Sequence, residues 1–466
     1  MRRSFSRPRV LVCCLVLGLL PVGCRKLLAV PTPQDEISAA EVFSSDENAE
    51  SALTGLYIQI MDNTRSLLNG GVTLYGGLSS DELYNVQRNP ILDPFRLNSL
   101  VSSNALCTNL YTSTYNLIFT ANSLITGLSG ASGVSAGVRN ELRGEAKFVR
   151  ALLYFYLVNL YGGVPLVTST DFAVSSVQPR ASMAAVYEQI VADLRDADTV
   201  LSAAYISASG YAGDRTRPNR AAAEALLARV LLYTGNWQAA EQAADSVIIN
   251  PLYRLEPSLD SVFLSSSREA IWQLQPVHDS MATAEGSLFI PAEGGRPGYT
   301  LTAGLVAAWE EGDLRPQHWT ASVVVNGGVV VYPYKYKLAS DNPPNTEYDM
   351  VLRLAEQYLI RAEARAQQGN VAGAAADLDM IRQRAGLAPT GAGSPAEILA
   401  AVAQERRVEL FAELGHRWLD LARTGQANAV LGVEKAPHWT GTDTLYPIPA
   451  AELQANPQLV QNPGYH

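Results

Sequence analysis

Apolar residues recur every three or four positions along most of this chain, and this spacing constrains the fold more than any other feature. After Glu41, the apolar run that includes Val42, Ala49, Leu53 and Ile60 keeps this interval, which places apolar side chains on one face of an α-helix. Similar runs, which we expect to form amphipathic helices, cover residues 104–126, 138–161, 182–201, 218–234, 237–249, 347–368, 371–385 and 395–424. Strands and helices do not alternate in the pattern, so the sequence predicts a mainly α protein.

Two helical stretches, near residues 218–249 and 347–385, share an internal pattern. In each copy a helix ends at a Gly-Asn pair, Gly235-Asn236 or Gly369-Asn370, and a second helix rich in alanine follows. Glycine adopts the positive φ that ends a helix, and small alanines let two helices approach closely. Tetratricopeptide-type helix pairs are built in this way. Because the two copies are not adjacent, we expect helix pairs embedded in one large domain rather than an open solenoid.

Between residues 251 and 346 the helical spacing is lost, and proline, glycine, serine and aromatic residues become frequent. The run from Val323 to Tyr336 is interrupted by Asn326-Gly327, a pair typical of a tight turn between antiparallel strands. The sequence therefore predicts a short β-hairpin inside an irregular, loop-rich insertion. Long irregular segments on a rigid scaffold are usually functional, so we expect residues 251–346 to face the ligand.

The N-terminus has the pattern of an export signal. Four arginines precede an apolar run from Val10 to Val22, and the run is too short to span a membrane. It ends at Gly23-Cys24, where a small residue precedes a cysteine as a lipoprotein signal peptidase requires. We expect residues 1–23 to be a signal peptide, Cys24 to carry lipid, and residues 24–40 to form a tether. Ordinary secretion, with Cys24 as an incidental cysteine, is the alternative.

The composition is acidic. The formal net charge of the chain is -10 at pH 7, and its first 23 residues contain arginines but no acidic residue, so the remainder is more acidic still. Such a surface repels nucleic acid and anionic lipid. We therefore expect no nucleic-acid partner, and attachment to a membrane through the lipid anchor only.

Little in the sequence points to catalysis. Cys107 is the one cysteine outside the expected signal peptide and lipid site, and its apolar neighbours predict a buried thiol. The 5 histidines show no metal-ligand spacing, and no glycine motif for phosphates or dinucleotides occurs. The match Gly133-Val-Ser135-Ala-Gly137 lies between two expected helices, whereas a nucleophile elbow follows a strand. We expect no catalytic residue, no metal and no cofactor.

The chain resembles the SusD/RagB family over essentially its whole mature length, and four segments carry the resemblance. They are the tether that starts Cys24-Arg-Lys-Leu-Leu, the stretch Glu145–Pro165, the arginine-rich run Glu405–Gly425, and the tail Leu445–Tyr465. The resemblance implies a single SusD-like domain over residues 41–466. It also implies nutrient capture on the outward face of the bacterial outer membrane, and delivery to a SusC-like TonB-dependent transporter without hydrolysis.

Charged residues of the arginine-rich run lie three to four positions apart. We expect them to pair along one helix as part of the scaffold; they are Arg406, Arg407, Glu409, Glu413, Arg417 and Asp420. A second set resembles a recurring family pattern and is expected to be structural as well, namely Asp313, Arg315, Lys335 and Tyr336.

Sugar rings have apolar faces and polar edges, so flat aromatic side chains and a few hydrogen-bonding groups bind them. The candidate ligand residues are Asp81, Tyr84, Asn85 and Arg88 in an early loop, and Tyr299, Trp309 and Trp319 in the insertion. Core packing is the alternative role for each of them. We expect an oligosaccharide ligand. A peptide ligand is the alternative within the family, and a tetratricopeptide-type protein-binding scaffold is the alternative outside it.

Overall fold

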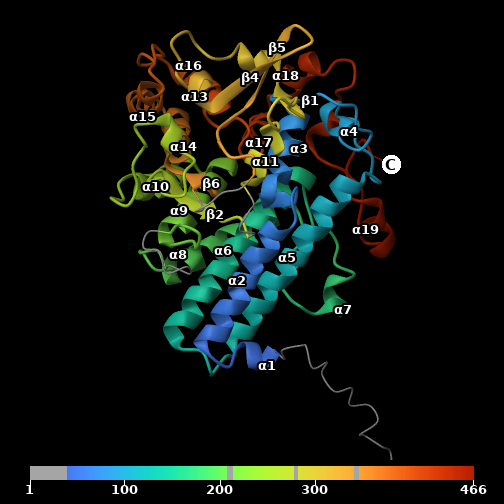
Figure 1. The fold of residues 1–466 in the computed structure, drawn as a ribbon. Coiled ribbons are helices and arrows are strands. Elements are labelled where there is room, and N and C mark those ends of the chain that lie inside the picture. The colour runs from blue at the N-terminus through green and yellow to red at the C-terminus, as the bar shows by residue number, and fades with distance from the viewer. Residues whose placement is uncertain (1–38, 207–213, 278–281, 341–345, 466) are drawn as a thin grey trace, which may run out of the picture.

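Long helices dominate the structure, a computed structural model that describes residues 39–206, 214–277, 282–340 and 346–465. Its N-terminal part is built on α2 (Asp46–Asp62), α5 (Ala105–Ser129) and α6 (Ala136–Tyr161), which pack side by side (Figure 1). Almost every residue of α6 from Gly144 onward is buried, so this helix forms the centre of the core. The expectation of a mainly α protein is confirmed.

Six further helices form a stacked array in which each packs on the next. They are α8 (Met183–Val200), α9 (Arg220–Tyr233), α10 (Trp237–Ile248), α14 (Leu354–Gln367), α15 (Val371–Arg384) and α16 (Pro395–Glu409). The two expected helix pairs are α9–α10 and α14–α15. They turn at Gly235 (φ 72°) and Gly369 (φ 79°), as the Gly-Asn pattern predicts.

The two helix pairs are far apart in sequence but adjacent in space, because α10 packs directly on α14. Ion pairs cross this boundary from Arg361 to Asp245 (2.5 Å) and from Arg365 to Glu241 (2.8 Å). The six helices therefore form one continuous array. The chain segment between α10 and α14 leaves the array and rejoins it beside α10.

Polar side chains at helix N-termini explain where several helices begin. Asn104 accepts hydrogen bonds from the Leu106 and Cys107 amides at the start of α5, and Ser182 and Asn219 cap α8 and α9 in the same way. At α16, Ser394 and Glu397 form a reciprocal capping box. Each cap satisfies amide groups that have no partner within the helix.

The remaining elements are short. The other helices are α1 (Ala39–Val42), η2 (Leu67–Gly71), α3 (Val72–Ser79), α4 (Asp93–Arg96), α7 (Phe172–Ser175), η3 (Leu259–Ser261), α11 (Ala284–Phe289), α12 (Ala303–Val306), α13 (Arg315–Trp319), α17 (His416–Arg423), α18 (Ala427–Glu434), η4 (Gly441–Thr444) and α19 (Ala450–Ala455). The strands are β1 (Leu83–Asn85), β2 (Ala270–Leu274), β3 (Tyr299–Leu301), β4 (Thr320–Val325), β5 (Gly328–Pro333) and β6 (Asp349–Arg353). The strands form three antiparallel pairs, β1–β3, β2–β6 and β4–β5.

The β4–β5 pair is the hairpin expected around Asn326-Gly327. Both turn residues have positive φ, 53° and 82°, and Val325 pairs with Gly328 directly beside the turn. The hairpin strands β4 and β5 and the short helix α13 lie in yellow and orange at the top of Figure 1, with the long N-terminal helices below them.

Two expected helices differ from the structure. Residues 349–353 form β6, and the helix begins only at Leu354. All five residues of β6 are buried, and its apolar centre, Met350-Val351-Leu352, is too short for its spacing to distinguish a strand from a helix. The expected helix 395–424 is divided into α16 and α17, because Ala412 (φ 51°), Leu414 (φ 43°) and Gly415 (φ 68°) turn the chain between them.

The C-terminal tail is fixed against the core. The Tyr446 amide donates to the Leu160 carbonyl (2.7 Å), and the Asn462 amide group donates to the Tyr161 and Tyr446 carbonyls (2.9 and 2.8 Å). Cys107 is buried as expected, and burial raises the pKa of its thiol to about 12.

Within the described ranges, the structure has no helix that combines the length and the apolar character needed to cross a membrane. The expected signal peptide, Cys24 and nearly all of the expected tether lie outside the described residues.

Candidate functional site

The two groups of predicted ligand residues meet at the β1–β3 pair, which we call the β1–β3 ribbon. Leu83 pairs with Leu301, Tyr84 with Thr300, and Asn85 with Tyr299. The early loop and the insertion, although more than two hundred positions apart in sequence, therefore form one small antiparallel sheet. The two predicted groups are therefore neighbours in space, which the sequence did not predict.

Tyr84 is the exposed aromatic side chain of the β1–β3 ribbon. Its exposed fraction is 47%, and the Arg96 guanidinium lies 4.9 Å from the centre of its ring. Arg88 and Val86 beyond it are also exposed. A partly exposed tyrosine with a cation against its ring is held in a defined orientation, so Tyr84 is the predicted residue best placed to contact a ligand.

Asp81 and Asn85 have different roles from those predicted. Both are buried, and Asn85 donates to the Asp93 carboxylate (2.6 Å) and to the Gln87 carbonyl (3.0 Å). Asp81 accepts from Arg407 and Arg417. Burial, together with the hydrogen bonds of the Asp81 carboxylate and the Asn85 amide nitrogen within the fold, leads us to correct the prediction of direct ligand contact for these two residues.

The predicted aromatic residues of the insertion are mostly core residues. Trp319 is 0% exposed and donates from its indole nitrogen to the Leu259 carbonyl (3.0 Å), while Tyr299 is 8% exposed and packs against Phe289. Neither offers a face to a ligand, and the prediction is corrected for both. Trp309 is half-buried, with its ring 5.4 Å from that of Phe411.

A cavity of about 560 Å³ lies near the β1–β3 ribbon, between α14, α16, α17 and α18. We call it the arginine pocket. Four guanidinium groups line it, together with two carboxylates, amide and hydroxyl side chains, and small or aliphatic residues: Arg406, Arg407, Arg417, Arg423, Glu363, Asp420, Gln367, Gln404, Gln426, Thr424, Leu399, Ala400, Ala403, Leu421 and Val430. Gln367, Ala400, Ala403 and Gln426 are exposed, so the pocket opens to solvent.

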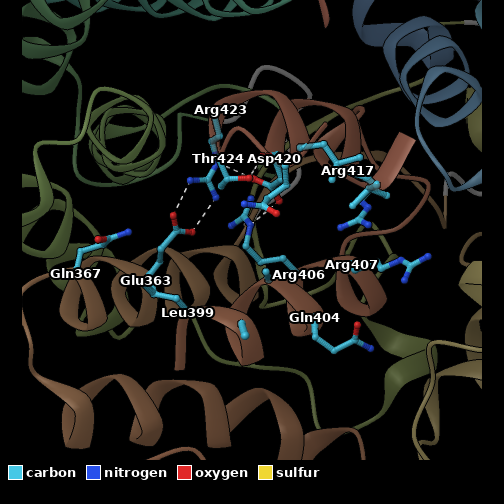
Figure 2. A pocket seen from close by; sticks show the side chains of 15 residues that line it. Glu363, Gln367, Leu399, Gln404, Arg406, Arg407, Arg417, Asp420, Arg423 and Thr424 are labelled. Atoms are coloured by element: carbon cyan, nitrogen blue, oxygen red, sulfur yellow. Dashed lines mark hydrogen bonds and ion pairs between the residues drawn. The ribbon is translucent and has the colours of Figure 1, made fainter. Parts of the chain in front are cut away.

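One flank of the arginine pocket is closed by a chain of ion pairs. Arg423 pairs with Glu363 through two hydrogen bonds (2.6 and 2.7 Å) and with Asp420 (2.8 Å), and Arg406 also binds Asp420 (2.7 Å). Figure 2 shows the Arg423–Glu363 pair as parallel dashed lines. Burial opposes ionisation of Asp420, but Arg406 and Arg423 outweigh this and lower the pKa of its carboxyl.

The other flank holds Arg407 and Arg417 (Figure 2). Both pair with the carboxylate of Asp81. Arg417 donates to both oxygens of Asp81 (2.7 and 2.9 Å), and Arg407 donates to Oδ2 (2.8 Å). Asp81 also accepts at its backbone carbonyl from Thr302, which follows β3. Asp81 therefore connects the arginine pocket to the β1–β3 ribbon.

Several pocket donors have no partner among the described residues. These buried atoms are both Nη atoms of Arg406 and the Nε atom of Arg407. Buried donors normally find partners, so the guanidinium groups retain hydrogen-bonding capacity.

The arginine-rich run pairs differently from its prediction. Because the chain turns between α16 and α17, Arg406 binds Asp420 across two helices rather than along one. Glu409 and Glu413 instead reach Arg353 on β6. The expectation that Asp313, Arg315, Lys335 and Tyr336 are structural agrees with their burial.

The prediction missed Arg407 and Arg417 as pocket residues. The adjacent arginines Arg406 and Arg407 point to different flanks of the arginine pocket (Figure 2). Their adjacency in the sequence could have indicated this, because neighbouring residues in a helix do not lie on the same face. Their acidic partner, Asp81, lies more than three hundred positions away, and no local pattern predicts that pairing.

Two acidic residues of the insertion, Glu310 and Asp313, are held in ion pairs rather than arranged as a glycosidase pair. Glu310 pairs with Arg382, and Asp313 pairs with the buried Arg315, whereas glycosidase carboxylates face each other across the scissile bond. Ser135 caps the junction between α5 and α6, so the Gly133–Gly137 match does not follow a strand. Among the described residues, no group of three histidine, cysteine or acidic side chains is arranged to hold a metal ion.

Known proteins with similar sequences and folds are SusD-like proteins. SusD-like protein P2 of Formosa agariphila is 26% identical over 97% of this chain and 98% of its own length. A SusD superfamily protein from Bacteroides vulgatus superposes with a TM-score of 0.79 at 21% identity, covering 90% of this chain and 99% of that one. A laminarin-binding SusD-like protein superposes with a TM-score of 0.75 at 26% identity, covering 91% of this chain and all of the other (100%).

Two family profiles account for most of the described chain. The profile described as "SusD family" matches residues 308–465, and the profile described as "Starch-binding associating with outer membrane" matches residues 37–232. Both ends of the fold, including β1, α16 and α17, fall within these matches. The chain therefore belongs to the outer-membrane-associated SusD/RagB family.

Proposed function

We propose that this protein captures an oligosaccharide at the outer membrane without cleaving it and passes it to a SusC-like TonB-dependent transporter. The observation that carries the proposal is the arginine pocket, which Asp81 connects to the β1–β3 ribbon that exposes Tyr84. The pocket offers amide and hydroxyl side chains together with small apolar residues, which is the mixture that sugar rings require. The laminarin-binding relative supports a glycan as the ligand.

The test of capture is a binding screen of the mature chain, from Arg25 onward, against oligosaccharides and peptides. Calorimetry detects binding, and mass spectrometry of the recovered ligand detects cleavage. We expect saturable binding of an oligosaccharide that is recovered intact. Cleavage of the ligand would show that the protein is an enzyme. Binding of peptides alone would show a peptide-capture protein, and the absence of binding to both libraries would favour a protein-binding scaffold.

Substitution of Tyr84 tests whether the β1–β3 ribbon belongs to the binding surface. Tyr84→Ala removes an exposed ring, so we expect the Kd to rise by roughly ten-fold, the magnitude of one lost aromatic contact, with little change in Tm. Phe172→Ala is the matched control, because Phe172 is 79% exposed on α7 at the other end of the molecule (Figure 1). Equal effects of the two substitutions on the Kd would remove the ribbon from the site.

We also infer that Cys24 anchors the protein by lipid and that the protein faces outward. The Gly23-Cys24 junction after an apolar run supports this proposal. Cys24→Ser should release the protein from the membrane fraction, and protease added to intact cells should degrade the anchored wild type. Membrane retention of the Cys24→Ser protein would contradict the anchor, and protection from protease would contradict the orientation.

A further inference from the structure

The two flanks of the arginine pocket differ in charge balance. On the flank near α14, the cations Arg406 and Arg423 face the anions Asp420 and Glu363, so their charges cancel. On the other flank, Arg407 and Arg417 both pair with Asp81 alone. One carboxylate cannot neutralise two guanidinium groups, so this flank carries an excess positive charge.

No neighbouring acid among the lining residues cancels this excess, since Glu363 and Asp420 are the two acidic side chains of the lining. Glu82, next to Asp81, is buried, and burial together with the charge of Asp81 raises the pKa of its carboxyl to about 8. Glu82 is therefore mostly neutral at pH 7. The excess charge stays on Arg407 and Arg417.

This local charge is opposite to that of the protein as a whole, which carries a formal net charge of -10. The general surface field repels an anionic glycan. A short-range guanidinium contact in a partly enclosed site is screened less by salt than a surface charge, so it can overcome that field locally. The side chains of Arg407 and Arg417 are 18% and 12% exposed, which leaves each in reach of a ligand in the pocket.

The chemistry of the remaining lining fits a sugar that carries an anion. Guanidinium groups bind carboxylate and sulfate oxygens through paired, charge-assisted hydrogen bonds. Leu399, Ala400 and Ala403 on α16 offer a small apolar surface beside these donors, suited to the apolar face of a ring.

We propose that the arginine pocket selects oligosaccharides that carry an anionic group, a uronic acid carboxylate or a sulfate ester, and that Arg407 and Arg417 bind that group. The inference rests on the proposed capture of an oligosaccharide, and it names the chemical class of the ligand and the side chains that distinguish it.

The experiment compares charged oligosaccharides with uncharged counterparts of the same backbone. One pair is an oligogalacturonide and its carboxyl-reduced form, and the other is a sulfated galactan oligosaccharide and its desulfated form. A third probe is a neutral laminarin oligosaccharide. Calorimetry on the mature chain at low salt should give a Kd at least about ten-fold lower for one charged form than for its neutral counterpart, as expected for charge-assisted hydrogen bonds.

Three variants locate the effect. Arg407→Gln removes one of the two guanidinium groups while Arg417 still binds Asp81 through two hydrogen bonds, and it should cancel the preference for the charged form. Ala403→Phe fills the arginine pocket from an exposed position, makes no change to the ion pairs, and should weaken binding of the charged form. Arg195→Gln, at an exposed position on α8, makes the same change in net charge and should retain the preference.

The outcomes separate this inference from the proposed function. Equal affinity for charged and uncharged forms would overturn the inference and leave oligosaccharide capture intact. A preference for the charged form that survives both Arg407→Gln and Ala403→Phe, or is lost equally in Arg195→Gln, would also overturn it. Failure of all five probes and of the wider glycan screen would remove the proposed function as well. If thermal unfolding shows that Arg407→Gln is misfolded, Ala403→Phe decides the test.

Discussion

Glu82 and His416 are buried ionisable residues whose protonation states are set mainly by burial. Burial, with the neighbouring charge of Asp81, raises the pKa of Glu82 from 4.5 to about 8, and burial lowers the pKa of His416 from 6.5 to about 4. Both groups are therefore largely neutral at pH 7 inside the fold. In the unfolded chain Glu82 is ionised at that pH, so its pKa shift makes stability depend on pH.

Replacement of Glu82 by glutamine tests that dependence. Between pH 4.5 and pH 8 the folded chain holds a proton on Glu82 that the unfolded chain releases. The free energy of unfolding therefore falls as pH rises through this window, by at most about 1.4 kcal/mol per pH unit. Glu82→Gln mimics the neutral acid and lacks this loss. Urea unfolding at pH 5 and pH 8.5 should show that the free energy of unfolding of the variant, relative to that of the wild type, is higher at pH 8.5 than at pH 5.

Parallel pH profiles for the wild type and the Glu82→Gln variant would mean that Glu82 is ionised in the fold. His416 acts in the opposite direction, since its depressed pKa costs stability as pH falls from 6.5 towards 4. The two contributions can be separated, because the contribution of His416 is absent above pH 7.

Helix-pair turns are the elements that the sequence predicts best, because their signal is local. A Gly-Asn pair with positive φ at the glycine ends the first helix of each pair. The conformational freedom of glycine is unfavourable inside a helix but favourable at a turn with positive φ. Gly55 lies inside α2, and an added Cβ there meets no atom within 4 Å, whereas Gly369 has equally open surroundings but a φ of 79°.

Alanine at these two glycines should therefore change stability in opposite directions. Gly55→Ala should raise the free energy of unfolding by about 0.5–1 kcal/mol, since glycine is unfavourable inside a helix. Gly369→Ala should lower it by about 1–2 kcal/mol, since alanine is strained at positive φ. Denaturant midpoints at constant m value measure both changes. A stabilising Gly369→Ala would show that the turn relaxes to negative φ.

Elements whose signal is not local were predicted less well. Residues 349–353 form a strand because they pair with β2. β2 lies more than seventy positions earlier in the chain, so no local sequence pattern reveals the pairing. The break between α16 and α17 occurs at Ala412 and Leu414, residue types that rarely adopt positive φ. At the candidate site, the sequence did not separate exposed from buried aromatic residues: Tyr84 is exposed, whereas Trp319 is buried.

At the scale of the whole molecule, a buried ion network joins the insertion to the helical array. Arg353 on β6 binds Glu269, Glu409 and Glu413, while Arg384 on α15 binds Glu269 and Glu409. These side chains come from four separate parts of the chain. Removal of one member leaves buried carboxylates without compensation, which is costly in a buried network.

Arg353→Met should therefore lower the free energy of unfolding by about 3–5 kcal/mol. Lys147→Met is the control, because Lys147 pairs with an Asp196 side chain that is 52% exposed, and loss of such a pair should cost less than about 1 kcal/mol. Thermal or urea unfolding of both variants measures the difference. Similar small effects would mean that water or local rearrangement compensates the buried carboxylates.

The β2–β6 pair makes the insertion tolerant of changes in length during evolution. Leu274 pairs with Asp349, so the intervening excursion is a loop whose ends are held together by two short strands. The entropy of closing a loop grows only with the logarithm of its length, about 0.6 kcal/mol for each doubling. Loop closure therefore sets little limit on the length of the exposed parts of this segment, such as the hairpin turn at Asn326-Gly327. Its buried residues Arg315, Trp319 and Lys335 hold the rest of it against the helices that it leaves and rejoins.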